Sequence, residues 1–525
     1  MKLFTFAAAL LVFAWPSAAI AQDDEKLKEA VKTARKAYEA ERFDEADRAF
    51  EGLAAAAQQN FDAMYLRAQI SFALGEFGKA VTFSDVALKL DGKSLDAWKL
   101  SGNALFASGE EAKADGRSSS GRVTGFYMNA AMAFEKAAEL KPDDAELREF
   151  VGHSYYWVGE DKLDASAKAF EKAIAMRPES ADAYFGLART LSAVADFEQR
   201  VAEDQKSEAK KAAAEAVRLK SVETAGKGLL VKTLLPATAE ELARLAFNGA
   251  ATGGKLDPAY AAFKAWAEAH PKSSTAHVWA GFVKVKMLED AAAVEHFQKA
   301  WDLSAKKNEV AVYELGMAAR RAGDLEKSCE MLAMAHDLRA DGWGEFSPLV
   351  MISDAANVHI ESRDYAKGIA LAEKYGVPRG DKSWALHGNL GLWYRDWADS
   401  TGGRGGKGEE AKTRNTAALK HYAKAAELVV KDEAAPASKK AQLVNDLGVI
   451  HHYQFGDWEK GLKEYRRALT FDGESIDPLE NLGICLNKLG KYEEAAEQFR
   501  KVLKQQPRRM VAARGLAEAE GKLKK

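Results

Sequence analysis

The side chains best suited to chemistry in this chain are ten histidines and two cysteines. His451 and His452 form the one adjacent histidine pair, but neighbouring residues of a helix point about 100° apart and cannot readily share a metal ion. Cys329 and Cys485 have neither the CxxC spacing of a metal site nor proximity in sequence, and both stand at apolar helix positions. We therefore expect structural histidines, two buried cysteines, no metal site and no disulfide.

A glycine-rich stretch at 401–408 invites comparison with a phosphate-binding loop. Such a loop needs Gly, four residues, and then Gly-Lys-Ser/Thr. Here the first position is Thr401, and Gly408 follows Lys407, so the stretch predicts a flexible loop within a helix hairpin. Neither Gly-x-Ser-x-Gly nor His-Glu-x-x-His occurs in the chain. No catalytic residue and no cofactor is predicted.

Aromatic residues gather at Trp384, Trp393, Tyr394 and Trp397. Rings of this kind stack on sugars or anchor peptides at binding surfaces. Two of them, Trp393 and Trp397, stand four residues apart, which is also the spacing of residues that pack into a core. We expect core packing for this cluster and keep glycan binding as an alternative.

The elements that position these residues recur about every 34 residues. The C-terminal copy consists of Leu479, Leu482, Gly483 and Leu486, then Gly490, Tyr492, Ala495, Phe499, Val502 and Pro507. Spacings of three and four predict one apolar helix face before Gly490 and a second one after it. Such a helix hairpin cannot bury its own apolar face, so it must stack on copies of itself.

A small residue in the first helix marks about twelve copies. The markers are Ala34, Ala68, Gly102, Gly152, Ala188, Gly281, Gly316, Ala356, Gly391, Gly448 and Gly483, with one degenerate unit at 239–271. A small residue is needed because the neighbouring helix crosses at this point.

This pattern resembles the tetratricopeptide repeat over residues 27–508, and specifically an exported bacterial protein of that type. The resemblance implies an all-α fold, a right-handed α-solenoid of about twelve helix hairpins. In such arrays the first helices line a groove that binds partner proteins or peptides. The resemblance places twelve residues at inward-facing positions of that groove: Lys99, Asn103, Glu149, His153, Tyr156, Arg189, Tyr313, Met317, Arg320, Asn357, Asn445 and His452.

One subgroup of the family binds C-terminal carboxylates through a Lys–Asn pair and further polar residues in the next units. Lys99 and Asn103 resemble that first pair. Phe150 stands where the subgroup carries its next Asn, so the set is incomplete and this ligand is not expected.

Departures from the period suggest boundaries. Extra residues fall at 114–125 and 401–410, and the stretch 197–219 lacks a helix breaker and predicts one long helix. We expect a signal peptide at 1–21, an N-terminal array with a long helical extension at its end at 22–221, a hinge at 222–236, a C-terminal array at 237–509 and a polar capping helix at 510–525.

The N-terminus has the features of a secretory signal. Lys2 precedes an apolar run at 3–15, Pro16 interrupts it, and an Ala-Ile-Ala sequence ends at Ala21. The run is short for a membrane span, so an uncleaved anchor is less favoured. We expect cleavage near Ala21, a periplasmic or extracellular location, and no stable membrane insertion afterwards.

The charge composition argues against nucleic-acid binding. A net charge of −3 provides no basic excess for nucleic acid. We expect a non-catalytic protein–protein interaction scaffold of the cell envelope. One alternative is a structural scaffold that binds cell-wall glycan through Trp393 and Tyr394. An enzyme would need a catalytic group in an insertion, and 114–125 and 401–410 contain neither His nor Cys.

Overall fold

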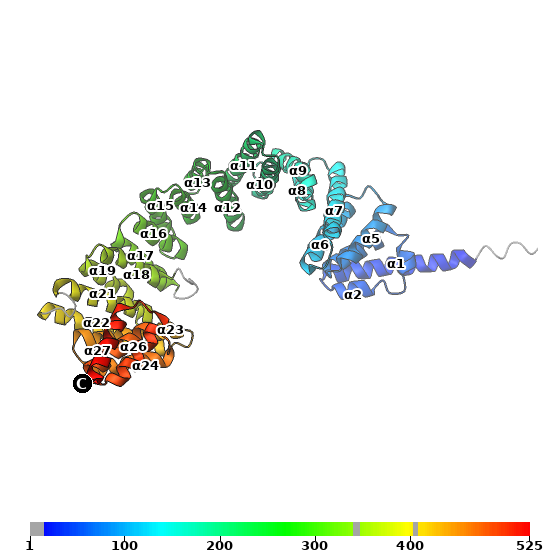
Figure 1. Ribbon diagram of the computed structural model, residues 1–525. Helices are drawn as coiled ribbons and strands as arrows, with labels where there is room; N and C mark the ends of the chain where they lie inside the picture. The colour runs from blue at the N-terminus through cyan, green and yellow to red at the C-terminus, as the bar shows by residue number, and fades with distance from the viewer. Residues whose placement is uncertain (1–14, 340–346, 403–407, 525) are drawn as a thin grey trace, which may run out of the picture. The chain divides into compact units, whose positions relative to one another are not determined.

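The computed structural model describes residues 15–339, 347–402 and 408–524, and these ranges contain helices and turns but no strand (Figure 1). The predicted all-α solenoid is confirmed, because within each compact unit successive helices pair into hairpins and neighbouring hairpins pack against one another. The chain divides after Pro271 into two compact units. None of the helices in the described ranges combines the length and the apolar character that a membrane crossing requires.

Unit 1 consists of residues up to Pro271. Its helices are α1 (Trp15–Glu39), α2 (Phe43–Arg48), α3 (Ala54–Ala57), α4 (Phe61–Ala73), α5 (Phe77–Leu90), α6 (Leu95–Asp115), α7 (Ser120–Leu140), α8 (Ala145–Val158), η1 (Glu160–Lys162), α9 (Leu163–Met176), α10 (Ala181–Asp204), α11 (Glu208–Leu229), α12 (Pro236–Gly253) and α13 (Asp257–Ala269).

Unit 2 begins at Lys272. Its helices in the described ranges are α14 (Ser274–Lys286), α15 (Asp290–Leu303), α16 (Glu309–Arg321), α17 (Leu325–Leu338), α18 (Pro348–Glu361), α19 (Tyr365–Leu371), the π-helical turn η3 (Ala372–Gly376), α20 (Val377–Gly380), α21 (Trp384–Gly402), α22 (Glu409–Lys431), α23 (Ala437–Val449), the π-helical turn η4 (Ile450–Gln454), α24 (Trp458–Phe471), α25 (Ile476–Lys488), α26 (Tyr492–Gln505) and α27 (Met510–Leu523).

Polar N-caps begin many of the first helices. Asn60 Oδ1 accepts from the backbone N–H of Ala63 at 2.9 Å, and the Ser180 hydroxyl accepts from that of Ala183 at 3.2 Å. These bonds satisfy N–H groups that a helix cannot pair internally. At these capped helices the sequence therefore sets the residue at which the hairpin begins.

An aromatic ring between two small residues holds neighbouring repeats together. Phe170 of α9 is fully buried, and a Cβ on Gly152 of α8 would lie 2.8 Å from its ring. A Cβ on Gly186, in the first helix of the next repeat, would overlap the same ring. Phe499 sits between Gly483 and Gly515 in the same way. Most marker glycines are small because an aromatic ring occupies the space of their side chains, and at Gly316 the side chain of Leu332 does so.

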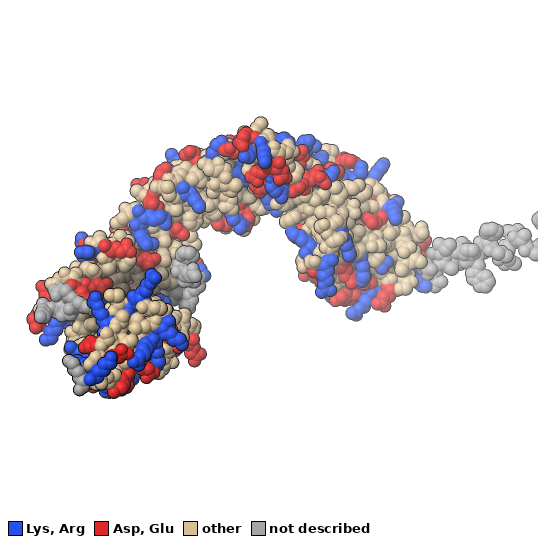
Figure 2. Space-filling view, in the orientation of Figure 1, with Lys and Arg blue, Asp and Glu red and all other residues tan. Residues whose placement is uncertain are grey.

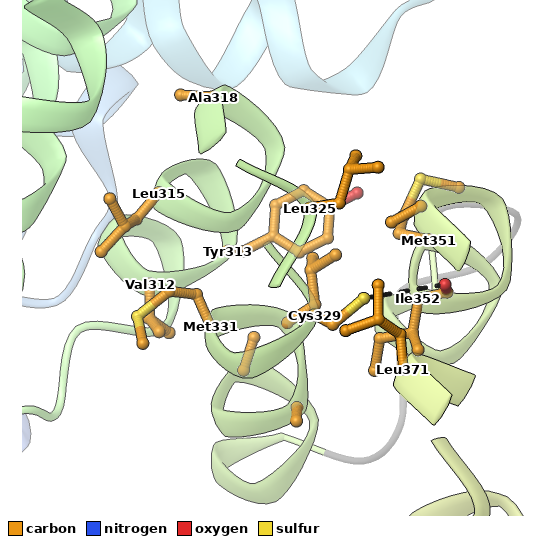
Figure 3. Packing of buried hydrophobic residues seen from close by; sticks show 14 of the residues in the cluster. Val312, Tyr313, Leu315, Ala318, Leu325, Cys329, Met331, Met351, Ile352 and Leu371 are labelled. Carbon is orange, nitrogen blue, oxygen red and sulfur yellow. Dashed lines mark hydrogen bonds between the residues drawn. The ribbon is translucent and has the colours of Figure 1, made fainter. Parts of the chain in front are cut away.

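The core of unit 2 includes a large apolar cluster on α16, α17, α18 and α19 (Figure 3). Cys329 lies in it with no exposed surface, beside Ile352. Cys485 is equally buried in the cluster near the C-terminus. Both are free thiols, and burial raises the pKa of each to about 12, so they stay protonated near neutral pH. The prediction of two buried, unpaired cysteines is confirmed.

The predicted long helix at 197–219 is wrong. The structure ends α10 at Asp204 and begins α11 at Glu208. Lys206 takes a left-handed backbone with φ 49°, and the Ser207 hydroxyl caps α11 by accepting from the N–H of Lys210. The segment is thus a turn between two long antiparallel helices, which pack along one another.

The structure also differs from the predicted hinge at 222–236. Residues 222–229 belong to α11, where Val222, Ala225 and Leu229 are fully buried, and the connection to α12 is confined to 230–235. The division between units comes later, after Pro271. Burial of α11 against α12 and α13 explains why the chain does not part at 222.

The insertion at 114–125 lengthens helices rather than forming a loop. α6 continues to Asp115, and α7 begins at Ser120. The second insertion, at 401–410, lies largely at 403–407, outside the described residues, as does the start of the expected signal peptide at 1–14. The backbone at the expected cleavage site near Ala21 is helical, within α1. The polar capping helix predicted at 510–525 corresponds to α27.

Candidate partner-binding surface

Three of the twelve predicted groove residues come together in unit 1. His153 and Tyr156 lie on α8, and Arg189 lies on the next first helix, α10. The Arg189 guanidinium carbon is 3.9 Å from the centre of the Tyr156 ring, and Nη2 is 3.2 Å from His153 Nδ1. The rings of Phe185 and Trp157 flank the same guanidinium at 5.2 and 5.5 Å. We call Tyr156, Trp157, Phe185, His153 and Arg189 the Arg189 cluster.

Burial sets the protonation of this cluster. Removal from solvent, with a smaller contribution from the Arg189 charge, lowers the pKa of His153 to about 4. The imidazole is therefore neutral near pH 7, and its Nδ1 accepts the hydrogen bond that Arg189 Nη2 donates. Arg189 Nε is buried with no hydrogen-bond partner among the described residues. The stacked guanidinium as a whole is half-buried, and a guanidinium held on aromatic rings is suited to recognition of a carboxylate or carbonyl oxygen.

Five other predicted groove residues are half-buried on first helices. Lys99 and Asn103 lie on α6, and Lys99 Nζ is 3.8 Å from a Glu146 carboxylate oxygen. Met317 and Arg320 lie on α16, and Asn357 on α18 donates to Glu361 at 2.7 Å. These side chains reach the surface, and their role in partner binding stays a prediction.

Burial argues against direct partner contact for the remaining four. Glu149, Tyr313, Asn445 and His452 are each at most 9% exposed. The Glu149 carboxylate accepts from Arg177 at 2.7 Å and from the Ser180 hydroxyl at 2.6 Å, so it joins two repeats. Asn445 accepts from Asn481 at 3.0 Å, and Tyr313 packs in the core shown in Figure 3.

The repeat register predicts His452 on the inner face and His451 at the packing position, and the structure reverses the two. His452 is 1% exposed, while His451 is half-buried. His452 Nδ1 lies 3.2 Å from the Tyr465 hydroxyl and 3.4 Å from Cys485 Sγ. The cause is the π-helical turn at 450–454, which adds a residue to one turn and rotates the later side chains of the helix.

A hollow of about 640 Å³ adjoins the Arg189 cluster, and the sequence did not indicate it. Its lining includes Tyr156, Trp157, Leu163 and Ala193, and α10 contributes more residues to it than any other helix. These two helices, 24 and 22 residues long, exceed the 14 residues of α8 and of α9. The hollow arises because the long hairpin extends past a short one. The extra length in the sequence was the available signal.

The aromatic cluster near residue 393 packs internally, as predicted. Trp393 is 4% exposed in the core of unit 2, and Trp384 Nε1 donates to Asp432 at 2.9 Å. The Tyr394 hydroxyl donates to Glu373 at 2.7 Å. No group of three or more His, Cys, Asp or Glu side chains in the described ranges is arranged to hold a metal ion.

The tetratricopeptide repeat profile matches this chain at residues 31–94, 158–196 and 481–523. These three segments carry tetratricopeptide repeats. The second matched segment contains α9 and much of α10, and the third contains most of α25, all of α26 and α27. Tetratricopeptide repeats generally serve as scaffolds that bind other proteins, and this is the coarse function that the fold supports.

Solved structures with similar arrays include the Cut9–Hcn1 hetero-tetramer of the APC/C, at 12% identity over 98% of this chain and 99% of that chain, with a TM-score of 0.28. Yeast Tom70 matches at 13% identity over 95% and 96% of the two chains, with a TM-score of 0.26. MamA matches at 19% identity over 40% of this chain and 96% of its own, with a TM-score of 0.28. No curated protein matches the sequence.

Proposed function

We propose that this protein is a non-catalytic scaffold of the cell envelope that binds partner proteins or peptides through the first-helix face of unit 1. One observation carries the proposal. The half-buried Arg189 guanidinium is stacked on Tyr156 and flanked by Phe185 and Trp157. Aromatic side chains and arginine are the residues that most often dominate the energetics of protein interfaces.

The chemistry of the cluster suits a protein ligand. The rings provide apolar contact area, and the guanidinium donates to a backbone carbonyl or carboxylate of the partner. The cluster is fixed in place, because the His153 ring also packs edge-on against Phe170 at 4.8 Å between centroids. Little conformational freedom is then lost on binding.

The glycan-binding alternative receives less support. Its two named residues are Trp393, which is buried, and Tyr394, whose hydroxyl is bonded to Glu373. The Trp393 ring is buried, and the Tyr394 ring is already stacked with Trp397 and His421, so neither is well placed to stack on a sugar.

The test of the scaffold role is crosslinking capture from envelope extract, with partners quantified by mass spectrometry. The bait is residues 22–525, and the variant is Arg189→Gln, which keeps much of the side chain's length but removes its charge and fork. We expect recovery of the specific partner to fall about tenfold or more, the effect of losing one interface hot spot. Arg466→Gln, an exposed ion-pair residue of unit 2, is the control and should recover partners at the wild-type level. Equal recovery by Arg189→Gln and wild type would place binding elsewhere.

The envelope location rests on the N-terminal sequence and has its own test. Protein purified from its native cells should begin at Gln22, as read by N-terminal sequencing, and should appear in the periplasmic or extracellular fraction. A protein that begins at Met1 in the cytoplasmic fraction would overturn the location without affecting the binding proposal.

A further inference from the structure

Two hollows meet along α10 of unit 1. The first is the one beside the Arg189 cluster, and the second, of about 520 Å³, lies between α10, α11 and the end of α12. Gln199, Arg218 and Thr252 line both, so the two are continuous. We call the combined surface the α10 trough. Acidic and basic side chains gather over α10 and α11 in Figure 2, in keeping with the polar wall of the trough.

The end of the trough near α8 is lined by apolar side chains, and its charged residues are already paired with one another. Tyr156, Trp157, Leu163 and Ala193 line it. The charged residues at this end are paired with one another: Glu160 with Arg200, and Asp196 with Arg218, the latter at 2.7 Å. Trp157 is held by Lys113, whose Nζ lies 3.3 Å from its ring centre. An uncharged, apolar side chain is what this end can bury without breaking an ion pair.

The end of the trough near α11 is acidic. Glu203, Glu208 and Glu215 line it together with Lys211. Lys211 is engaged by Glu208 at 2.8 Å, and Glu215 by Lys255 at 2.6 Å. Glu203 accepts from the Gln199 amide at 2.7 Å, which leaves its negative charge without a direct ion-pair partner among the described side chains. A positively charged side chain of the ligand could pair with Glu203 at this end of the trough.

We propose that the α10 trough binds a partner segment in which an apolar side chain, aromatic or leucine, is followed within a few residues by lysine or arginine. The apolar side chain enters beside Trp157, and the cation pairs with Glu203. The inference deepens the proposed function, because it specifies the protein ligand, but it places the recognition on α10 and α11 rather than on Arg189.

The trough is unsuited to a negatively charged ligand. Five carboxylates and three cations line it, so an acidic peptide or a nucleic acid would meet net repulsion. The two cations at the apolar end, Arg200 and Arg218, are already engaged by Glu160 and Asp196, so they offer an anion little attraction. The order of the two features along α10 also sets the direction of the bound segment.

The experiment uses fluorescein-labelled peptides and the full chain, with binding followed by polarisation. Each peptide has ten residues and blocked ends, with one phenylalanine and two lysines separated by one to four glycines. Matched probes replace the phenylalanine by serine or the lysines by glutamate. We expect saturable binding for at least one spacing, and about tenfold or greater loss with either matched probe.

Variants locate the site. Ala193→Trp fills the apolar end and should weaken the best probe about tenfold or more, with an unchanged helical circular-dichroism signal. Glu203→Lys should weaken it severalfold and lessen its salt dependence. Glu493→Lys, a similar charge reversal on an exposed site of unit 2, is the control. A photoreactive benzophenone in place of the phenylalanine should label Trp157 or Leu163.

Two results would overturn the proposal: no saturable binding of any spacing, or binding that Ala193→Trp and Glu203→Lys leave unchanged. Ala193→Trp acts beside Tyr156 and Trp157, which belong to the Arg189 cluster, whereas Glu203 lies outside that cluster. Glu203→Lys is therefore the variant that separates the two proposals. If the probes fail while Arg189→Gln still loses its partner in the capture experiment, the trough proposal falls and the scaffold proposal stands. If wild type captures no partner but the probes bind as expected, the scaffold proposal falls and the trough proposal stands.

Discussion

Replacing Phe170 by alanine is expected to destabilise unit 1 by about 3–5 kcal/mol, the usual range for deleting a buried phenylalanine. The ring is fully buried and fills the space between Gly152 and Gly186, which belong to successive repeats. Neither glycine has a side chain that could move into the vacated volume. The cavity should therefore persist, which places the loss toward the upper part of the range.

The loss should also reach the Arg189 cluster. His153 packs edge-on against Phe170 and accepts the hydrogen bond of Arg189. With the ring removed, His153 loses the contact that fixes its orientation. We expect Phe170→Ala to weaken partner capture as well as stability, although Phe170 itself is buried and cannot touch a partner.

Hydrogen exchange measured by mass spectrometry suits this prediction, because a chain of two compact units need not unfold in a single step. Peptides from α8, α9 and α10 should exchange at least a hundredfold faster in Phe170→Ala, whereas peptides from α24 to α26 should not change. Met176→Ala, at the exposed end of the same helix, is the control. Wild-type protection in α8 and α10 would show that the ring does not join these repeats.

The repeat period was sufficient to place the hairpins. A marker glycine such as Gly152 or Gly483 indicated a close crossing, and in the structure each faces an aromatic ring. The same register brought His153, Tyr156 and Arg189 to one surface, because residues about one period apart occupy equivalent positions on adjacent helices. Periodicity is informative here since each repeat buries the same face against its neighbours.

The repeat period could not predict two local features of the backbone, the helix break at 205–207 and the π-helical turn at 450–454. The break at 205–207 depends on Lys206 in a left-handed conformation, which a lysine rarely signals. The π-helical turn at 450–454 exchanged the environments of His451 and His452. A single added residue per turn leaves no mark on composition, yet it rotates every later side chain in the helix.

The α10 trough was not predicted from the sequence for a different reason. Its residues come from α8, η1, α9, α10, α11 and α12, and apart from Tyr156 none stands at a predicted groove position. The trough depends on the difference in length between adjacent hairpins. That difference was visible as extra residues after Ala188, but the sequence expectation of one continuous helix concealed the hairpin that creates the wall.

Replacing Asp446 by asparagine should stabilise unit 2 at pH 7. Burial raises the pKa of Asp446 to about 6, against the opposing effects of Arg395 and of the Asn445 amide, which donates to it at 3.4 Å. The ordinary value for an aspartate in the unfolded chain is about 3.9. The folded protein therefore binds a proton more tightly at this site than the unfolded chain does.

The sign of the pH effect comes from that difference. The contribution of Asp446 to stability is fully present below the unfolded pKa and is lost as the pH rises through about 6. At pH 7 the carboxylate is ionised and poorly solvated. A shift of this size corresponds to at most about 3 kcal/mol, and some remaining contact with solvent reduces the expected gain from Asp446→Asn to about 1–2 kcal/mol.

The gain should be seen at pH 7 and should vanish near pH 4, where Asp446 is protonated in the folded protein. Hydrogen exchange of α23 and α25 peptides at several pH values, corrected for the intrinsic dependence on pH, measures this difference. Glu493→Gln, which alters an exposed carboxylate of the same unit, should produce no such pattern. A variant that is less stable than wild type at pH 7 would mean that the attraction between the ionised Asp446 carboxylate and the Arg395 charge outweighs the cost of burying that carboxylate.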